Sequence, residues 1–422
     1  MQLILLSIIS FLICAEEEII PLRPFFQNVT SDIPTIKLQS GKYGGNWIRV
    51  KDYDRRIQSM SSDQNVTITV DADTAPLVEV SSAAFKLKAV SIIPSPNYVF
   101  IKANVTCTIV FDEVIHNYLE SDAHVVLIDK GTVEFIANTF LATTKLHKSL
   151  LEISGSAAAG EYRTLRIIDT NIRSIRIESS DSLLATAYPI GKIEILNCSF
   201  VHISHVLPQT KDPLYECPDT VKIENTTFTN CTAPLGGGIV FGVFAENLSL
   251  EQVSITLCTA TRSDALSIPS AKPWVWIENS NFSNCLTATA PFDGGVLWFP
   301  KPVKMTIKTS RFMNNSCSGN GGALGLAGGV NSLNIVNSQF ISNTAARGGA
   351  LFVGQNTTFV DSKFSFENVT FANRAKIGSD IAVEVMPRNL TENCFTNCSS
   401  RSGSPRIFDE ATRKGYDWTN SS

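Results

Sequence analysis

Four aromatic side chains have the types and spacing best suited to binding a ligand. Trp274 and Trp276 alternate within one short apolar run, and Trp298 and Phe352 each follow a pair of glycines. An outward-facing tryptophan offers a flat apolar surface that can stack on a sugar or anchor a protein partner. These four residues are our candidate ligand contacts. The alternative is that a long loop or the tail covers them.

Side chains that could perform catalysis or bind a metal are scattered along the sequence. Asp264, Asp293 and Asp380 lie near predicted turns, where a single carboxylate usually helps to form the turn. Glycoside hydrolysis needs two carboxylates at a set separation, and a Ca²⁺-assisted lyase needs several clustered oxygens. We interpret His202 and His205 as a surface pair, because no third metal ligand is evident beyond nearby cysteines. We expect no catalytic residue, no metal and no cofactor.

A repeat of about 28 residues positions these side chains. In each copy two apolar residues alternate, a polar residue follows, and an apolar anchor comes three residues later, as in Val221, Ile223, Asn225 and Phe228. Alternation predicts a strand with one buried face, and Asn favours a sharp turn because it tolerates left-handed backbone. The eight clear anchors are Ile172, Phe200, Phe228, Ile255, Phe282, Phe312, Phe340 and Phe371.

A second predicted strand begins about ten residues after an anchor, where glycine pairs occur. Its first apolar residues are Ile239, Leu297, Leu324 and Leu351. A unit of short strands without helical spacing predicts one coil of a parallel β-helix, in which neighbouring coils pair at ~4.8 Å. Equivalent Asn side chains would stack as a ladder inside the turn. We predict an all-β, right-handed parallel β-helix (a solenoid), because parallel crossovers are right-handed.

The predicted domain organisation has four parts. Residues 1–15 are uncharged and mostly apolar, which predicts a cleaved signal peptide, with a lipoprotein signal ending at Cys14 as the alternative. Residues 16–130 are irregular β coils with an N-terminal cap, residues 131–400 are the right-handed parallel β-helix, and residues 401–422 are a polar C-terminal tail. No later run of eighteen apolar residues occurs, so we expect a secreted or cell-surface protein with no further membrane span. The formal net charge of −4 argues against a nucleic-acid partner.

Cysteine spacing is compatible with a disulfide between neighbouring coils. Cys231, Cys258 and Cys285 each follow an anchor by three residues, so stacked neighbours would lie within disulfide range. One pair among the three could form, and buried thiols are the alternative. Cys394 and Cys398 could bridge locally near the end of the stack.

Fourteen Asn-X-Ser/Thr sequons, more than chance gives for this composition, indicate a secreted glycoprotein. Asn197, Asn225 and Asn368 are sequons that fall in the Asn ladder, where the side chain should point inward, so we predict that they stay unmodified. Sequons at outward or loop positions are better acceptors. These candidate acceptors are Asn230, Asn247, Asn281, Asn314 and Asn356.

Two copies of the repeat resemble a known family. The chain is similar to the FxxN and GGA-aliphatic repeat pair of chlamydial polymorphic membrane proteins at residues 312–315 (FMNN) with 321–324 (GGAL). Residues 340–343 (FISN) with 348–351 (GGAL) match the pair again. Similar repeats occur in trichomonad surface proteins, and the fold expected is that of the pectin lyase-like β-helices. The resemblance covers about 240 residues and implies an adhesin-like surface protein.

We expect a non-enzymatic, adhesin-like protein that binds an extracellular protein or carbohydrate through its solenoid faces. A structural surface or coat component without a specific ligand is one alternative, and a pectin lyase-like polysaccharide-degrading enzyme is another. Enzymes of this fold usually carry catalytic groups on the outer face of the strand after the glycine turn. The expected outward residues there include no acid, base or metal ligand: Val240, Ser267, Trp298, Gly325, Phe352 and Ala382. An enzyme site would have to be built from loops, for example residues 206–219.

Overall fold

A computed structural model of the chain describes a stack of coils. Side chains are described at residues 68, 84–92, 107–116, 131–140, 164–173, 191–203, 220–232, 247–259, 274–287, 295–300, 302–354, 363–384, 390–391, 394–400 and 407–415. Other strands are described by their backbone alone. The predicted signal peptide at residues 1–15, the insertion at residues 206–219 and the candidate acceptor Asn356 lie outside the described residues.

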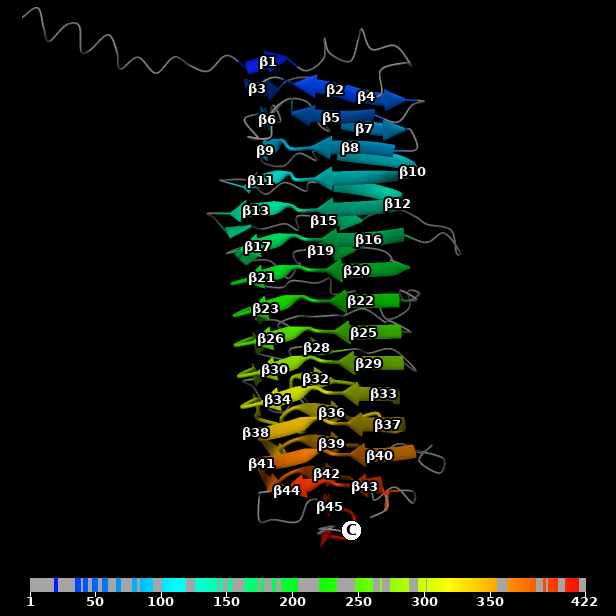
Figure 1. The fold of residues 1–422 in the computed structure, drawn as a ribbon, viewed down its shortest axis with the longest axis vertical. Coiled ribbons are helices and arrows are strands. Elements are labelled where there is room, and N and C mark those ends of the chain that lie inside the picture. Colours follow the sequence, from blue (N-terminus) through cyan, green and yellow to red (C-terminus); the bar gives the residue numbers. More distant parts are fainter. Residues whose placement is uncertain are drawn as a thin grey trace, which may run out of the picture.

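The coils form a right-handed parallel β-helix, as predicted (Figure 1). From residue 247 onward, each coil contributes a strand to sheet 1, turns at the Asn position into sheet 2, and crosses behind to sheet 3. Neighbouring coils pair in parallel, so that Phe228 lies between Phe200 and Ile255 in register. The anchors of the sequence repeat are therefore structurally equivalent positions.

Three long sheets contain nearly all of the strands. Sheet 1 consists of β2 (Thr35–Leu38), β4 (Ile48–Lys51), β5 (Arg55–Ser59), β7 (Val78–Ser81), β8 (Ala84–Lys88), β10 (Ile101–Asp112), β12 (Val126–Ile136), β15 (Leu151–Ile153), β16 (Arg163–Ile168), β19 (Leu184–Thr186), β20 (Lys192–Leu196), β22 (Thr220–Glu224), β25 (Asn247–Glu251), β29 (Trp274–Glu278), β33 (Val303–Lys308), β37 (Val330–Val336), β40 (Lys363–Glu367) and β43 (Phe395–Thr396). Sheet 2 consists of β1 (Ile19–Pro21), β3 (Gly41–Gly44), β6 (Val66–Thr69), β9 (Ser91–Ile93), β11 (Ile115–Tyr118), β13 (Thr139–Ala142), β17 (Asn171–Arg173), β21 (Ser199–Val201), β23 (Thr227–Thr229), β24 (Thr232–Ala233), β26 (Ser254–Thr256), β27 (Thr259–Ala260), β30 (Asn281–Ser283), β31 (Leu286–Thr287), β34 (Arg311–Met313), β35 (Ser316–Cys317), β38 (Gln339–Arg347), β41 (Thr370–Ile377) and β44 (Ser399–Ser400). Sheet 3 consists of β28 (Leu266–Ser267), β32 (Leu297–Trp298), β36 (Leu324–Leu326), β39 (Leu351–Val353), β42 (Ile381–Val383), β45 (Ile407–Asp409) and β46 (Lys414–Tyr416), and β14 (Lys145–Leu146) pairs with β18 (Arg176–Ile177).

The interior is filled by side chains that repeat from coil to coil. In β22 the burial alternates, with Val221 and Ile223 inside and the residues between and beside them turned outward. Many anchors stack as aromatic rings, and the ring centroid of Phe312 lies 4.6 Å from that of Phe282 and 4.7 Å from that of Phe340. Burying one such side chain contributes about 1.5–3 kcal/mol, so this continuous column is a main source of stability.

The Asn position turns the chain from sheet 1 into sheet 2. Asn197, Asn225 and Asn368 have φ of 55°, 47° and 52°, the left-handed conformation that Asn tolerates. The predicted ladder is present, because Asn225 Nδ2 donates to Asn197 Oδ1 at 2.9 Å and Asn368 Nδ2 donates to Asn337 Oδ1 at 2.9 Å. These side chains are exposed, so the expectation that they point inward is wrong.

The residue after each of these Asn residues points inward instead. A single left-handed residue interrupts the alternation of the strand, which leaves its own side chain outside and turns the next one into the core. Thr226, for example, is buried, and its hydroxyl donates to the carbonyl of Glu224 at 2.8 Å. Ser280 and Ser310 make the equivalent contact in later coils.

A second turn, three residues after the anchor, contains two different columns of buried side chains. In the C-terminal coils Asn315 Nδ2 donates to Asn343 Oδ1 at 2.9 Å, and Asn343 Nδ2 donates to Asn373 Oδ1 at 2.8 Å. This buried amide ladder ends at Asp380, whose Oδ1 accepts from Asn373 Nδ2 at 3.0 Å. In the three preceding coils the position is occupied by Cys231, Cys258 and Cys285.

Glycine pairs place the start of the sheet 3 strand against the next coil. A Cβ at Gly322 would lie 2.3 Å from the carbonyl oxygen of Gly349, and a Cβ at Gly349 would lie 2.3 Å from that of Ser379. Backbone atoms cannot move aside for a side chain, so glycine is required at these positions. The GGAL part of the sequence repeat is explained by this close approach.

A hairpin follows the last parallel strand of sheet 3. Within residues 401–422, predicted to be a polar tail, β45 and β46 pair antiparallel, and Glu410 Oε2 accepts from Arg347 Nη1 at 2.7 Å. Toward the other end, strands before residue 131 belong to sheets 1 and 2. In the described part of the chain, no helix has the length and hydropathy needed to cross a bilayer.

Candidate ligand-binding face

The outer face of sheet 1 is a regular surface that displays three side chains per coil. Every second residue of a strand is buried, so β29 turns Trp274, Trp276 and Glu278 outward. Strand pairing aligns such residues into three rows parallel to the solenoid axis. We call them the far row, which contains Trp274, the middle row, which contains Trp276, and the near row, which contains Glu278 and lies next to the Asn turn.

Trp274 is the most exposed large apolar side chain among the described residues, at 59%. Asn247 and Lys304 are its neighbours in the far row. The ring lies on a strand that is paired on both sides, so its backbone is fixed before any ligand arrives. An exposed indole on a rigid strand can bind the apolar face of a ligand without the cost of ordering a loop.

Trp276 is half-buried beside Trp274, and its orientation is fixed by two charged groups. Its indole Nε1 donates to Glu278 Oε2 at 3.0 Å. The Lys308 Nζ lies 4.5 Å from the ring centroid, a cation–π contact. The two tryptophans therefore form a small aromatic platform with one exposed and one oriented ring.

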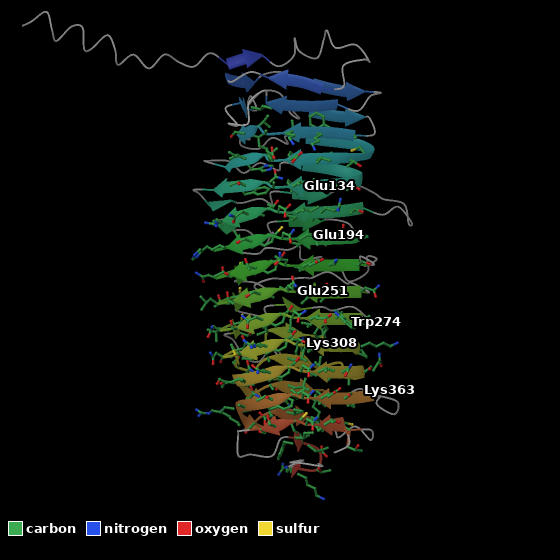
Figure 2. The ribbon with its side chains drawn as sticks, in the orientation of Figure 1. Glu134, Glu194, Glu251, Trp274, Lys308 and Lys363 are labelled. Atoms are coloured by element: carbon green, nitrogen blue, oxygen red, sulfur yellow. The ribbon has the colours of Figure 1, made fainter. Side chains whose placement is uncertain are left out.

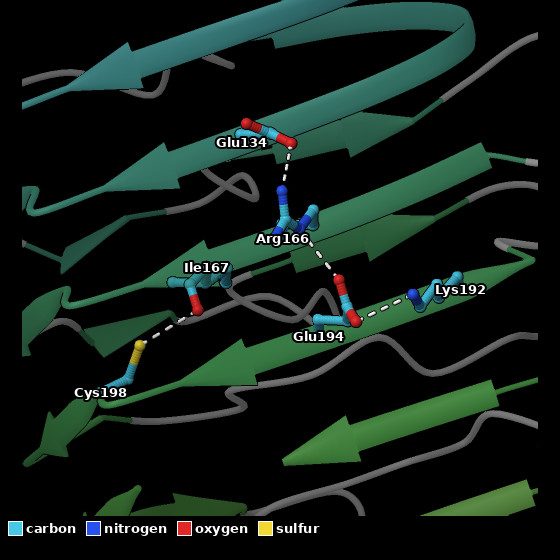
Figure 3. Close-up of polar contacts among 6 residues, drawn as sticks. All are labelled: Glu134, Arg166, Ile167, Lys192, Glu194 and Cys198. Carbon is cyan, nitrogen blue, oxygen red and sulfur yellow. Dashed lines mark hydrogen bonds and ion pairs between the residues drawn. The ribbon is translucent and has the colours of Figure 1, made fainter. Parts of the chain in front are cut away.

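Toward the N-terminus the outer face carries ion pairs between coils. In the middle row Arg166 Nη1 donates to Glu134 Oε1 at 2.7 Å and Arg166 Nε donates to Glu194 Oε2 at 2.9 Å (Figure 3). Lys192 Nζ lies 2.9 Å from Glu194 Oε1. Burial acts against ionisation of Glu194, but the hydrogen bonds from Lys192 and Arg166 outweigh it and hold the pKa of this carboxyl below its ordinary value. This part of the face is electrostatically satisfied by the protein itself.

Toward the C-terminus the same rows change their chemistry. Figure 2 shows Glu134, Glu194 and Glu251 before Trp274 along the axis, and Lys308 and Lys363 after it. The far row continues in register from Trp274 through Lys304 and Ser332 to Lys363, all on the outer face. The middle row continues from Trp276 through three neutral residues that can donate and accept hydrogen bonds: Thr306, Asn334 and Ser365.

The other two predicted ligand contacts lie apart from this platform. Trp298 is half-buried in β32 of sheet 3. Phe352 was expected to face outward, but it is only 1% exposed because the Arg347 guanidinium lies 4.6 Å from its ring centroid. That guanidinium is held by Asn320 and by Glu410 of the C-terminal hairpin. Phe352 is therefore covered with the help of the C-terminal hairpin, in line with the alternative considered for these aromatic residues.

The cysteines at the second turn are buried thiols, the alternative considered to a disulfide between neighbouring coils. In-register parallel strands hold equivalent Cβ atoms at the coil spacing of ~4.8 Å, beyond the ~3.5–4.5 Å that a disulfide requires. Cys231 Sγ donates to the Phe200 carbonyl and Cys258 Sγ to the Phe228 carbonyl, both at 3.7 Å. The hydrogen bond to Cys258, together with burial, raises the pKa of Cys231.

Other cysteines also serve the core. Cys394 and Cys398, which were candidates for a local bridge, are thiols, and Cys398 Sγ donates to the Phe366 carbonyl at 3.4 Å. Cys198 occupies the inward position after Asn197, where it donates to the Ile167 carbonyl at 3.3 Å (Figure 3). Burial raises the pKa of Cys198 to about 12, so this thiol stays protonated at neutral pH.

The predicted glycan acceptors differ in how accessible they are. Asn230, Asn247 and Asn314 are exposed, whereas Asn281 is partly buried with its Nδ2 3.3 Å from Ser283 Oγ. Asn247 is the acceptor adjacent to Trp274. The ladder residues expected to stay unmodified have Nδ2, the atom that a glycan would join, engaged with the preceding coil, as in the Asn225–Asn197 bond. That these residues stay unmodified remains a prediction, now based on the hydrogen bonds of their Nδ2 atoms.

His202 has a structural contact rather than a metal ligand set. It occupies the left-handed position of the second turn, and its Nδ1 is 2.9 Å from Asn230 Nδ2. His205, Asp264 and Asp293 lie outside the described residues. Within the described ranges no group of three or more His, Cys, Asp or Glu side chains could hold a metal ion.

The sequence argument overlooked one set of outward carboxylates. Glu224, Glu251 and Glu278 occupy the near row in three successive coils, in register at the coil spacing of ~4.8 Å. The signal was present in the repeat, because glutamate directly precedes the polar turn residue in each of these copies. These carboxylates lie on the strand before the Asn turn, whereas the enzyme hypothesis places catalytic groups on the strand after the glycines.

Comparisons with known proteins give one structural likeness to report and no family. No protein-family model matches the sequence, and no curated protein matches it. Among solved structures, the chain is similar to tailspike protein 3 of bacteriophage CBA120, with 13% sequence identity and a TM-score of 0.38. The alignment covers 93% of this chain and 61% of the tailspike chain, so this chain spans less than two thirds of the tailspike's length.

Proposed function

We propose that this protein is a secreted or surface-associated, non-enzymatic β-helix that binds an extracellular carbohydrate through Trp274 and Trp276. The observation that carries the proposal is the 59% exposure of Trp274 on a rigid strand, beside a second tryptophan whose orientation is fixed. The resemblance of residues 312–351 to repeats of adhesin-like surface proteins supports the surface location.

A carbohydrate suits this face better than an apolar protein partner. The platform is small, and it is surrounded by polar side chains, among them Ser249, Asn247 and Thr306. A sugar ring combines an apolar face, which the indole can cover, with hydroxyl groups, which such side chains can bind. Protein interfaces instead need a larger apolar centre with few charges.

Glycan-array binding of the secreted protein tests the proposal. Trp274→Ala and Trp276→Ala are expected to abolish or strongly weaken binding, because a central aromatic contact is worth about 2 kcal/mol or more. Trp298→Ala is the matched control, since Trp298 lies on sheet 3. Retained circular dichroism shows that the variants are folded. Undiminished binding by Trp274→Ala, or no binding by the wild type, would overturn the proposal.

The near-row glutamates make the enzyme alternative testable on the same ligands. Glu251 accepts a hydrogen bond from Ser249, and Glu278 accepts one from Trp276. If the protein is not an enzyme, incubation with a bound glycan releases no new reducing ends. Release that disappears in Glu251→Gln or Glu278→Gln would contradict the non-enzymatic assignment. Self-association of the wild type without glycan binding would favour a structural role instead.

A further inference from the structure

We infer that the ligand of this face is an anionic polysaccharide that runs along the solenoid axis from Trp274 over Lys304, Ser332 and Lys363. This inference rests on the proposed function, and it names the chemical class of the ligand and its direction on the protein. We call these four far-row residues the binding track.

The lysines of the binding track differ from those of the N-terminal coils. Lys192 and Lys222 pair with Glu194 and Glu224 on their own strands. In the described part of the chain, no ion pair joins Lys304, Lys308 or Lys363 to an acidic side chain. Their charges are available to an anionic partner, and charge complementarity is the argument for that partner.

The spacing of the track suits a polymer with repeated charges. Lys304 and Lys363 flank Ser332 in the far row, so they are two coils apart, or ~9.6 Å at the usual strand spacing. Between the charges, Ser332 in the far row and Asn334 in the middle row provide neutral hydrogen-bonding groups. A polysaccharide in which acidic groups alternate with hydroxyl groups would place its charges at the lysines and its hydroxyl groups at Ser332 and Asn334.

The acidic residues define the direction. Glu224, Glu251 and Glu278 lie in or before the tryptophan coil, where they would repel an anion. Glu278 is engaged by the Trp276 indole, and the Lys308 ammonium adds positive charge over the Trp276 ring. Glu367 is at the opposite end of β40 from Lys363, in the near row. A chain anchored on Trp274 therefore continues toward the C-terminus along the far row.

Beyond Trp274, the track is clear of predicted glycans. None of the outward residues of β29, β33, β37 and β40 belongs to a sequon, whereas β25 begins at the sequon residue Asn247. A glycosylated form of the protein would keep the face over β33, β37 and β40 open, whereas a glycan at Asn247 would reach only the Trp274 end of the track. An acidic peptide could use the same lysines, but it would leave the exposed Trp274 ring and the neutral middle row without a specific role.

The test compares binding of the full secreted chain to heparin, polygalacturonate and dextran, which are sulfated, carboxylated and neutral polysaccharides. We expect at least one acidic polysaccharide to bind tighter than dextran. Lys304→Gln/Lys363→Gln should lower that affinity about tenfold, since each exposed charge contact contributes modestly. Lys192→Gln/Lys222→Gln makes the same charge change in the N-terminal coils and should alter affinity less than twofold. Binding by the wild type should weaken as salt rises.

Several outcomes would overturn the inference. An equal loss of affinity in both double variants would indicate a general effect of charge. An unchanged affinity in Lys304→Gln/Lys363→Gln would show that these lysines do not bind the polysaccharide. If polyglutamate binds as tightly as the acidic polysaccharide, and Trp274→Ala does not weaken that binding, the face is an unspecific polyanion surface. Trp274-dependent binding of neutral glycans without preference for acidic ones would overturn this inference and leave the proposed function standing. No binding of any polysaccharide would overturn both.

Discussion

The outer face of sheet 1 has one backbone geometry and two chemistries. In the coils before β29, charged side chains of neighbouring strands satisfy one another, as Arg166 does with Glu134 and Glu194 (Figure 3). After β29 the far and middle rows carry lysines without carboxylate partners and neutral polar groups, starting from an exposed tryptophan. Because the scaffold is the same in both regions, the fold alone does not require this difference.

The interior of the stack changes in the same direction along the chain. The second turn is filled by weakly hydrogen-bonding thiols at Cys231, Cys258 and Cys285, and then by the amide ladder of Asn315, Asn343 and Asn373. Amides satisfy two backbone groups and each other, whereas thiols are small apolar side chains with a weak donor. The coils beneath Lys304, Ser332 and Lys363 are thus held by stronger polar contacts than the coils before them.

The largest expected effect breaks this interior contrast. Asn343→Ala removes the donor to the Phe312 carbonyl and the acceptor of both the Asn315 backbone N–H and Asn315 Nδ2, at a cost of about 3–5 kcal/mol in unfolding free energy. Cys258→Ala removes a small buried thiol and should cost about 1–2 kcal/mol. Urea denaturation of both variants measures the difference. Equal destabilisation would show that the amide ladder adds nothing to the packing.

A smaller effect separates the two regions of the outer face. Arg166→Met should destabilise the fold by about 1 kcal/mol, because the guanidinium joins three coils but remains partly solvated. Lys304→Met should change stability by less than about 0.5 kcal/mol, because this lysine has no ion pair. Thermal or urea unfolding of the two variants measures the difference in their unfolding free energies. A larger cost at Lys304 than at Arg166 would contradict the division of the face.

The Arg166 contribution should depend on pH in a defined direction. The folded-state pKa of Glu194 is lowered from its ordinary 4.5, so its stabilising contribution is present above that value and is lost as pH falls through the lowered pKa. The cost of Arg166→Met, measured by urea denaturation, should therefore be largest near pH 7 and shrink below pH 4.5. If Arg166→Met destabilises the protein equally at pH 7 and pH 3, the ion pairs of Arg166 do not contribute to stability.

The smallest expected effect concerns a glycan at the boundary between the two regions. Asn247 is the far-row neighbour of Trp274, so a glycan there would cover part of the ring. Asn247→Gln keeps an amide but removes the acceptor, and it should increase carbohydrate binding about threefold, or ~0.6 kcal/mol. Asn314→Gln, which removes an exposed acceptor at the second turn, is the control. Weaker binding by Asn247→Gln would mean that its glycan assists the platform.

The sequence predicted the fold because the repeat encodes it directly. Anchors such as Phe228, the GGAL pairs and the polar turn residues each correspond to one position of the coil, and their spacing alone aligns the strands. The direction of the Asn side chains was wrong because periodicity locates a turn without revealing how one left-handed residue shifts the alternation after it. Asn225 therefore makes its ladder on the surface while Thr226 enters the core.

The candidate site was predictable only in part. Alternation correctly placed Trp274 and Trp276 on the outside, since both lie within a strand whose buried residues are obvious. Alternation also placed Phe352 outside, but burial there depends on Arg347 and on a hairpin that begins 55 residues later at Ile407. The carboxylate row and the unpaired lysines needed the register between coils, which combines residues about 28 positions apart.

The most direct test of the account is calorimetric titration of a glycan that binds the wild-type protein into the wild type and into Trp274→Ala. Loss of the exposed ring should weaken binding by about 2 kcal/mol, roughly thirtyfold, with an unchanged melting temperature. Trp298→Ala should bind as the wild type does. Equal affinities of the wild type and Trp274→Ala would contradict the assignment of this face as the ligand-binding surface.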